Sequence, residues 1–332
     1  MSGPRLVFLG TPGTACPFLE SLVSAGFEVA GVIAQPDRPV GRGMKMCCPP
    51  VKNSALALNL PVFQPASGAE LREAVAALKP DLGVVVAYGR LIKKEVLSLP
   101  PLGFINLHFS LLPRYRGAAP VQWSLINGET ETGVTVFRLD EGMDTGPVVA
   151  SVRPPVDPAE DAPALFARLT ELGRALLVSS VREIGAGRAS FTPQSGEPSH
   201  APKIRPALSF LSPSMTPAAA FDLFRGLACG PRARFATPAG MTVQVLKASL
   251  RPPTVDTIPH GVHGAGVPGT VGHVEPGRGF FVRFTGGSLF LEELKPEGRG
   301  PVGAADFLNG ARLVPGDALI VPPTAGGEGP HK

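Results

Sequence analysis

The spacing of apolar residues predicts alternating strands and helices over the first part of the chain. Continuous or nearly continuous apolar runs, typical of buried strands, occur at residues 5–10, 27–34, 82–87, 104–107, 134–139 and 147–152. Apolar residues three and four positions apart predict helices at residues 17–25, 67–78 and 159–184. Because strands alternate with helices, we expect residues 1–187 to form a doubly wound α/β domain with a mostly parallel, Rossmann-like sheet.

The pattern changes after this domain. Residues 188–207 are rich in Ser, Thr, Pro, Gly and charged residues, which predicts a linker. Residues 208–318 then read as a short helix followed by short strands with Gly/Pro turns, which predicts a small, OB-like β-barrel. The strands are expected at residues 242–249, 269–273, 279–284 and 288–294. Residues 319–332 are expected to form a disordered tail.

Charge and composition narrow the function classes. The net charge of +4 belongs to the C-terminal part, since residues 1–199 hold 18 Lys/Arg and 18 Asp/Glu, whereas residues 200–332 hold 13 and 9. This excess predicts that the C-terminal part contacts a polyanion. No run of about 20 apolar residues predicts a membrane span, and no secretory signal is recognisable, so we expect a cytoplasmic protein. The four cysteines lack metal-ligand spacing and are expected to be reduced, without a metal.

The candidate chemistry begins at the end of the strand predicted at 104–107. Asn106 and His108 are two positions apart, so they share one face of an extended chain. Asp140 and Asp144 follow another predicted strand, and in an open α/β sheet the carboxyl ends of strands meet in one crevice. A carboxylate next to the imidazole would fix its tautomer, and the amide would donate to a developing oxyanion. This combination favours acyl transfer without a nucleophilic Ser or Cys over a structural polar cluster.

Two other segments have open readings. The turn after the first strand, at residues 10–13, lacks G-x-G-x-x-G, which favours a structural turn over a dinucleotide site. The loop at residues 35–46 is long and carries Arg38, Arg42 and Lys45. It is equally compatible with a solvated mobile loop and with a contact to a phosphate backbone.

The same residues resemble the formyltetrahydrofolate-dependent formyltransferase family. The resemblance is carried by N-x-H-x-S-L-L-P at 106–113 and D-x-G-x-D-T-G at 140–146. The segments at 35–43, 84–89, 114–122 and 201–204 extend it, so that it covers nearly the whole chain.

The resemblance implies transfer of a formyl group from 10-formyltetrahydrofolate, as co-substrate and without a metal, to the α-amine of methionyl initiator tRNA. It implies that the chain is an enzyme of translation initiation. The sequence does not state its oligomeric state, and a monomer is our default expectation. The site residues that it implies are Asn106, His108 and Asp144 for catalysis, Ser110, Leu111, Leu112 and Pro113 for folate, and Arg38, Arg42 and Lys45 for tRNA.

The chain also departs from the family's pattern, and alternatives stay open. Phe109 stands where a small residue is common and would reshape the folate entrance, and Met44 and Met46 stand where lysines are expected. Residues 226–234 lack the family's aromatic pattern. The nearest alternative is a formyltransferase acting on a sugar amine. From other classes, the alternatives are an RNA-binding module without catalysis and a nucleotide-binding regulator.

Overall fold

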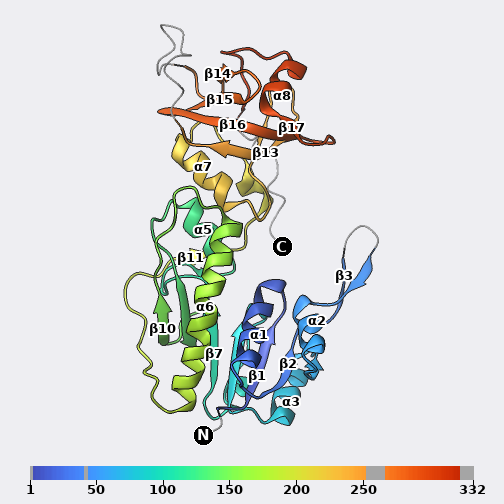
Figure 1. Ribbon diagram of the computed structural model, residues 1–332, viewed down its shortest axis with the longest axis vertical. Helices are drawn as coiled ribbons and strands as arrows, with labels where there is room; N and C mark the ends of the chain where they lie inside the picture. The colour runs from blue at the N-terminus through green and yellow to red at the C-terminus, as the bar shows by residue number, and fades with distance from the viewer. Residues whose placement is uncertain (1–2, 41–43, 252–265, 322–332) are drawn as a thin grey trace. The chain divides into compact units, whose positions relative to one another are not determined.

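The computed structural model describes residues 3–40, 44–251 and 266–321, and the chain divides into two compact units (Figure 1). The first unit comprises Met1–Pro120, Glu131–Val156 and Leu165–Pro202, and the second comprises Val121–Thr130, Asp157–Ala164 and Lys203–Lys332. The expected domain boundaries at 187 and 207 stay predictions.

A seven-stranded sheet forms the centre of the first unit. Its strands are β1 (Leu6–Gly10), β2 (Val29–Ile33), β5 (Val62–Phe63), β6 (Leu82–Val86), β7 (Phe104–His108), β9 (Val134–Arg138) and β10 (Val148–Val152). Their order is β10-β9-β7-β6-β1-β2-β5, and the four pairs from β7 to β5 are parallel. The continuous apolar strands β1 and β6 are buried at every position, as expected for a sheet covered on both faces. The predicted α/β class is confirmed.

Helices cover both faces of this sheet because alternate side chains of each strand point to opposite sides. On one face, Val7, Leu9 and Val85 pack with residues of α3 (Gly68–Leu78) and α4 (Lys94–Leu97). On the other face, α6 (Ala162–Gly185) approaches α1 (Cys16–Ser24) and β7, since Gly173 lies beside Phe18 and Leu107. Ser67 caps α3 by accepting a hydrogen bond from the N–H of Glu70, which explains where that helix begins.

The strand β9 runs against the direction expected for it. It pairs antiparallel with β7, so Arg138 at the end of β9 lies opposite Ile105 near the start of β7. The carboxyl ends of these two strands are therefore at opposite edges of the sheet. The expectation that they meet in one crevice was wrong for this pair, because nothing in a short apolar run states its direction.

The segment predicted as a linker is part of the first unit as far as residue 202. Its β11 (His200–Ala201) pairs in parallel with β8 (Arg116–Gly117), and Thr192 forms an antiparallel bridge with Val148. Backbone hydrogen bonds need no apolar pattern, so composition alone made this stretch look like a linker.

Two short strands and two short helices lie in segments where the spacing of apolar residues predicted no element. These are the hairpin of β3 (Arg38–Val40) with β4 (Lys45–Cys47), and the helices α2 (Pro50–Ala57) and α5 (Pro120–Ile126). Both helices begin at a proline, which is tolerated in the first helical turn because its missing N–H would have no partner there.

An antiparallel sheet builds the second unit, as predicted. It contains β12 (Arg234–Ala236), β13 (Thr242–Ser249), β16 (Gly287–Pro296), β15 (Gly279–Phe284) and β14 (Val271–Glu275) in that order, with β17 (Val302–Gly303) paired to β16. The bridges Ala318–Thr270 and Val321–Ala236 join the two ends of this order, which closes the sheet.

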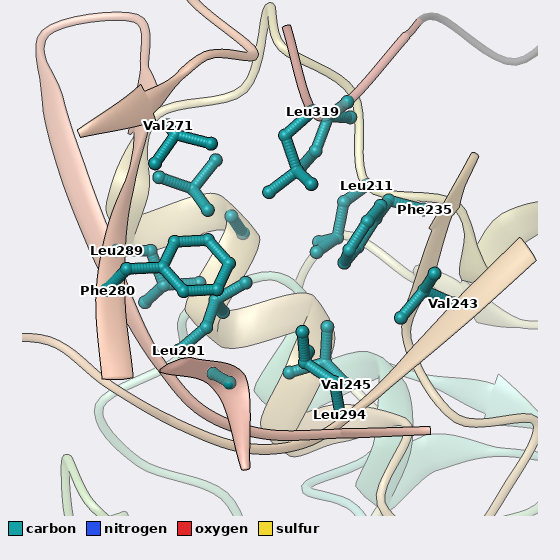
Figure 2. Packing of buried hydrophobic residues seen from close by; sticks show 14 of the residues in the cluster. Leu211, Phe235, Val243, Val245, Val271, Phe280, Leu289, Leu291, Leu294 and Leu319 are labelled. Atoms are coloured by element: carbon teal, nitrogen blue, oxygen red, sulfur yellow. The ribbon is translucent and has the colours of Figure 1, made fainter. Parts of the chain in front are cut away.

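The interior of the second unit is apolar (Figure 2). Phe280, Leu291 and Phe235 from the strands pack with residues of α7 (Pro217–Gly226) and α8 (Ala304–Ala311). Leu319 and Ile320 are buried in the same cluster. Residues 319–321 therefore pack in the core, contrary to the prediction of a disordered tail, because the bridges of this segment close the sheet. The rest of the predicted tail, residues 322–332, lies outside the described residues.

Two findings bear on the expectations drawn from composition. Within the described ranges, no helix is long and apolar enough to cross a membrane. Cys16, Cys47, Cys48 and Cys229 are all free thiols. Burial raises the pKa of the Cys16 and Cys229 thiols above the ordinary value.

Candidate active site

His108 and Asp144 lie side by side in the first unit. His108 ends β7 and is buried. Its Nε2 lies 2.9 Å from the carbonyl oxygen of Tyr115, and because a carbonyl only accepts, Nε2 carries a hydrogen in this arrangement. Its Nδ1 lies 3.8 Å from Oδ2 of Asp144, a separation longer than a hydrogen bond. The ring is thus held through one nitrogen while the other faces a carboxylate.

Asn106 completes the group of side chains predicted for catalysis. It stands two residues before His108 on β7, is half-buried, and lines the same cavity. Its side-chain amide makes no hydrogen bond to another described residue, so both of its N–H donors remain for a molecule in the cavity. The structure therefore brings Asn106, His108 and Asp144 together at one site.

The loop from Asp140 to Gly146 carries Asp144 back to His108. Oδ1 of Asp140 accepts hydrogen bonds from the N–H of Gly142, at 3.1 Å, and from the hydroxyl of Thr145, at 2.6 Å. Asp144 has a φ of 55°, in the left-handed region, which reverses the chain. Its Oδ2 accepts a hydrogen bond from the N–H of Gly117, at 2.8 Å. Asp140 therefore shapes the loop, and Asp144 is its residue that faces the imidazole.

The two glycines of the motif at 140–146, Gly142 and Gly146, occupy different surroundings. A side chain at Gly146 would collide with the carbonyl oxygen of Arg138, so this position needs glycine for packing. Gly142 lines the cavity, and a Cβ there would collide with the hydroxyl of Thr145.

A cavity of about 620 Å³ opens beside these residues. Its lining includes Asn106 and His108 of β7, the turn after β6, and residues of the 139–144 loop. Leu91 and Met143 line it and are 70% and 65% exposed. An apolar cavity with a few converging polar groups is typical of a small-molecule site.

The segment predicted to contact folate, residues 110–113, is not part of the described cavity lining. Neither Ser110 nor Leu111, Leu112 or Pro113 is among the residues that line the cavity. Ser110 is fully buried, and its hydroxyl donates to the carbonyl oxygen of Arg114 at 2.6 Å. The carbonyl of Ser110 accepts from the hydroxyl of Thr135 at 2.7 Å. These bonds fix the loop between His108 and Tyr115, and the role of the four residues as folate contacts stays a prediction.

We expect the variant Ser110→Ala to lower the free energy of unfolding by about 1–2 kcal/mol, because it removes a buried hydrogen bond to a carbonyl. The KM for the folate co-substrate that the resemblance implies should not change, since the hydroxyl points to the protein. Chemical denaturation and steady-state kinetics measure the two effects. A raised KM at unchanged stability would instead make Ser110 a ligand contact.

Phe109 packs among aromatic rings rather than across an open entrance. Its ring lies 4.8 Å from that of Phe166 and 5.9 Å from that of Phe18, measured between centroids, and it is buried. Phe109 and Phe166 line the cavity, so this cluster forms an apolar part of its lining.

The predicted basic loop is a hairpin in its described part. Arg38 starts β3, is exposed, and lies within 3.4 Å of Oε1 of Gln35. Lys45 starts β4, and Arg42 lies outside the described residues. Nζ of Lys52 lies 2.8 Å from Oδ2 of Asp37 at the base of the hairpin. Hydrogen bonds from Lys52 and Gln64 lower the pKa of Asp37.

Some residues of the site carried no signal in the sequence. Gln194 donates to the carbonyl oxygens of Asp144 and Gly146, and Ser199 accepts from the N–H of Tyr115. Both lie in the stretch whose composition suggested a linker. Leu91 and Met143 could have been suspected from their position next to motif residues, but not from any pattern of their own.

No metal site accompanies the cavity in the part of the chain that the structure describes: no group of three or more His, Cys, Asp or Glu residues is arranged to hold an ion. No Ser or Cys is among the described residues that line the cavity. An imidazole, a carboxylate and an amide on a doubly wound α/β unit are side chains with which an enzyme acts on reacting atoms by hydrogen bonds and charge.

The comparisons with known proteins give the family. The model of the formyl transferase family matches residues 4–181, and that of the formyl transferase C-terminal domain matches residues 203–312. The chain belongs to the formyl transferase family, which confirms the resemblance carried by the motifs at 106–113 and 140–146.

Relatives of similar length support this assignment. A methionyl-tRNA formyltransferase of Halorhodospira halophila is 42% identical over 322 residues, which cover 95% of this chain and 99% of the relative. Those of Moorella thermoacetica and Geotalea uraniireducens are 40% and 39% identical, over 95% and 96% of this chain and 99% of each relative.

Solved structures share the fold at lower identity. The N-formyltransferase of Helicobacter canadensis, solved with folinic acid and dTDP-3-aminofucose, has a TM-score of 0.64 at 18% identity, over 88% of this chain and 99% of its own. HypX of Aquifex aeolicus, solved with tetrahydrofolic acid, has a TM-score of 0.62 at 18% identity, over 96% of this chain and 49% of its own.

Proposed function

We propose that this chain transfers the formyl group of 10-formyltetrahydrofolate to the α-amine of methionine carried by initiator tRNA, in translation initiation. The observation that carries the proposal is its identity of about 40%, over nearly its whole length, to methionyl-tRNA formyltransferases. The grouping of Asn106, His108 and Asp144 at one cavity supports it. Charged initiator tRNA belongs to the cytoplasm, which supports the predicted location; the monomeric state stays a prediction.

The reaction sets three tasks for the protein. The amine attacks the formyl carbon, so the formyl oxygen becomes negative, the attacking nitrogen becomes positive, and the bond to N10 of the folate breaks as N10 takes up a proton. The protein must donate hydrogen bonds to the formyl oxygen, and it must hold the donor groups in place. It must also pass a proton from the attacking nitrogen to N10.

The three side chains suit these tasks. The free N–H donors of Asn106 and an N–H of His108 stabilise the negative oxygen. Nδ1 of His108 is the ring nitrogen without a protein carbonyl as its acceptor, and Asp144 beside it stabilises a proton held there. Asp144 itself is oriented by the N–H of Gly117.

The cavity fits a folate in size and chemistry. Its volume of about 620 Å³ lies within the range of about 300–1,000 Å³ common for small-molecule sites. The exposed Leu91 and Met143 provide apolar surface for a flat ring system. This supports the co-substrate role proposed for 10-formyltetrahydrofolate.

The test is incubation of the purified protein with 10-formyltetrahydrofolate and one acceptor at a time. We expect formylmethionine on charged initiator tRNA and no product with a nucleotide-linked amino sugar. Formylation of the amino sugar alone would favour the sugar-amine alternative. Binding of tRNA without formylation of either acceptor would favour a module without catalysis.

We expect the hairpin to contribute to tRNA binding through its cations. The double variant Arg38→Ala/Lys45→Ala should raise the KM for tRNA. It should also make the fall of log K for tRNA binding with log salt concentration less steep by about 2, one unit for each phosphate that is no longer neutralised. The KM for 10-formyltetrahydrofolate should not change. Titrations at several salt concentrations measure the slope.

The control for this prediction is Arg188→Ala, an exposed cation after α6 that pairs with Glu183. It should leave the salt slope unchanged. An equal change in the control and in the hairpin variant would mean that net charge matters and the hairpin does not.

A further inference from the structure

A strap formed by residues 192–201 returns to the catalytic loops of the first unit. At one end, Thr192 and Val148 exchange two backbone hydrogen bonds of 2.7 and 2.9 Å. At the other end, the hydroxyl of Ser199 accepts from the N–H of Tyr115 at 2.9 Å, and β11 pairs with β8. The strap is therefore fixed on both sides of Gln194.

Gln194 uses its whole side-chain amide between the two loops of the site. Its Nε2 donates to the carbonyl oxygens of Asp144 and Gly146, both at 2.8 Å. Its Oε1 accepts from Nη2 of Arg116 at 2.6 Å. Arg116 precedes Gly117, whose N–H binds the carboxylate of Asp144. The side chain of Gln194 thus binds both segments that meet where Gly117 contacts Asp144.

The loop needs such a connection because of its conformation. The left-handed φ of Asp144 is unfavourable for a residue with a Cβ and persists only where the surroundings enforce it. The bonds of Asp140 hold the first half of the loop, at Gly142 and Thr145. Those of Gln194 hold the second half, at the carbonyls that flank Thr145. Without them the backbone at Asp144 could relax, and its carboxylate would turn away from His108.

We propose that Gln194 is a positioning residue of the formyl-transfer site, which acts through Asp144 by fixing its backbone. This inference rests on the proposed function. It assigns the donor side of the amide, Nε2, to the loop of Asp144 and the acceptor side, Oε1, to Arg116. Gln194 is not among the residues that line the cavity, so its side chain acts on the loop and not on a molecule bound there.

Two variants separate these halves of the amide. Gln194→Ala removes every bond, and Gln194→Glu keeps an acceptor for Arg116 but turns an oxygen toward two carbonyl oxygens. We expect both to lower kcat about 10- to 100-fold, as displacement of a reacting group does, with the KM values for folate and tRNA unchanged. Thr192→Ala, an exposed side chain two residues earlier in the strap, is the matched control and should be normal.

The decisive measurement repeats Gln194→Glu in an Asp144→Asn background. A residue that acts through Asp144 loses its effect there, so the second substitution should change kcat less than about threefold. The same full loss in both backgrounds, or a normal kcat for Gln194→Glu alone, overturns the proposal. Folding is checked by the thermal midpoint and by tetrahydrofolate binding, which a misfolded variant would lose. If the unsubstituted protein forms no formylmethionine, it is the proposed function that fails.

Discussion

His108→Ala is expected to lower kcat for formyl transfer about 10²- to 10³-fold, which corresponds to about 3–4 kcal/mol of transition-state stabilisation. The variant removes the ring that lines the cavity and whose Nδ1 faces Asp144. The KM for folate should change little, because most of the described cavity lining is untouched. Steady-state kinetics at saturating tRNA measure both constants.

The control for His108→Ala is His200→Ala. His200 is exposed and lies on β11, where its backbone pairs with Arg116. Its removal should leave kcat unchanged. Since His108 also holds the carbonyl of Tyr115, circular dichroism and the thermal midpoint must show that His108→Ala stays folded. A folded His108→Ala with nearly normal turnover would exclude the catalytic role.

Asp144→Asn is expected to lower kcat by about 10²-fold, because it removes the negative charge 3.8 Å from the imidazole while keeping the shape of the side chain. Asparagine is the suitable substitution, since it tolerates the left-handed φ and its oxygen can still accept from the N–H of Gly117. Single-turnover kinetics show whether the chemical step is the one affected.

Glu141→Gln is the matched control for this charge. Glu141 lies in the same loop, is exposed, and forms an ion pair with Lys94, at 3.0 Å. Its neutralisation should leave kcat within about twofold, as expected for exposed ion pairs. If both variants lost activity equally, the total charge of the loop, and not the position of Asp144, would be the cause.

The apolar pattern was sufficient to predict the main elements of both units. The runs at β1, β6 and β15 and the helical spacing of α3 and α6 lie within a few residues of the observed bounds. The direction of β9 was not predictable from its residues, because a five-residue apolar strand reads the same in parallel and antiparallel pairing.

The grouping of His108 with Asp144 was predicted, but for an incorrect geometric reason. The ends of β7 and β9 lie at opposite edges of the sheet, and the contact exists because the Asp140–Gly146 loop turns back. That turn depends on hydrogen bonds of Asp140, Thr145 and Gln194. Such bonds join residues up to 50 positions apart, and no local pattern reveals them.

For the segment at 110–113, the sequence motif was clear but the predicted ligand contact is not seen in the cavity lining. Its motif identifies the family, yet the structure gives it bonds within its own loop and to Thr135. A motif records that a loop must keep its shape as readily as it records a ligand contact, and only coordinates separate the two reasons.

The most direct test of the account is a double-mutant cycle on the single-turnover rate of formyl transfer, with His108→Ala, Asp144→Asn and the double variant. If the carboxylate works through the imidazole, the double variant should be as slow as His108→Ala alone, within about threefold. Rate losses that multiply would mean that the two side chains act independently, and would contradict the arrangement proposed for this site.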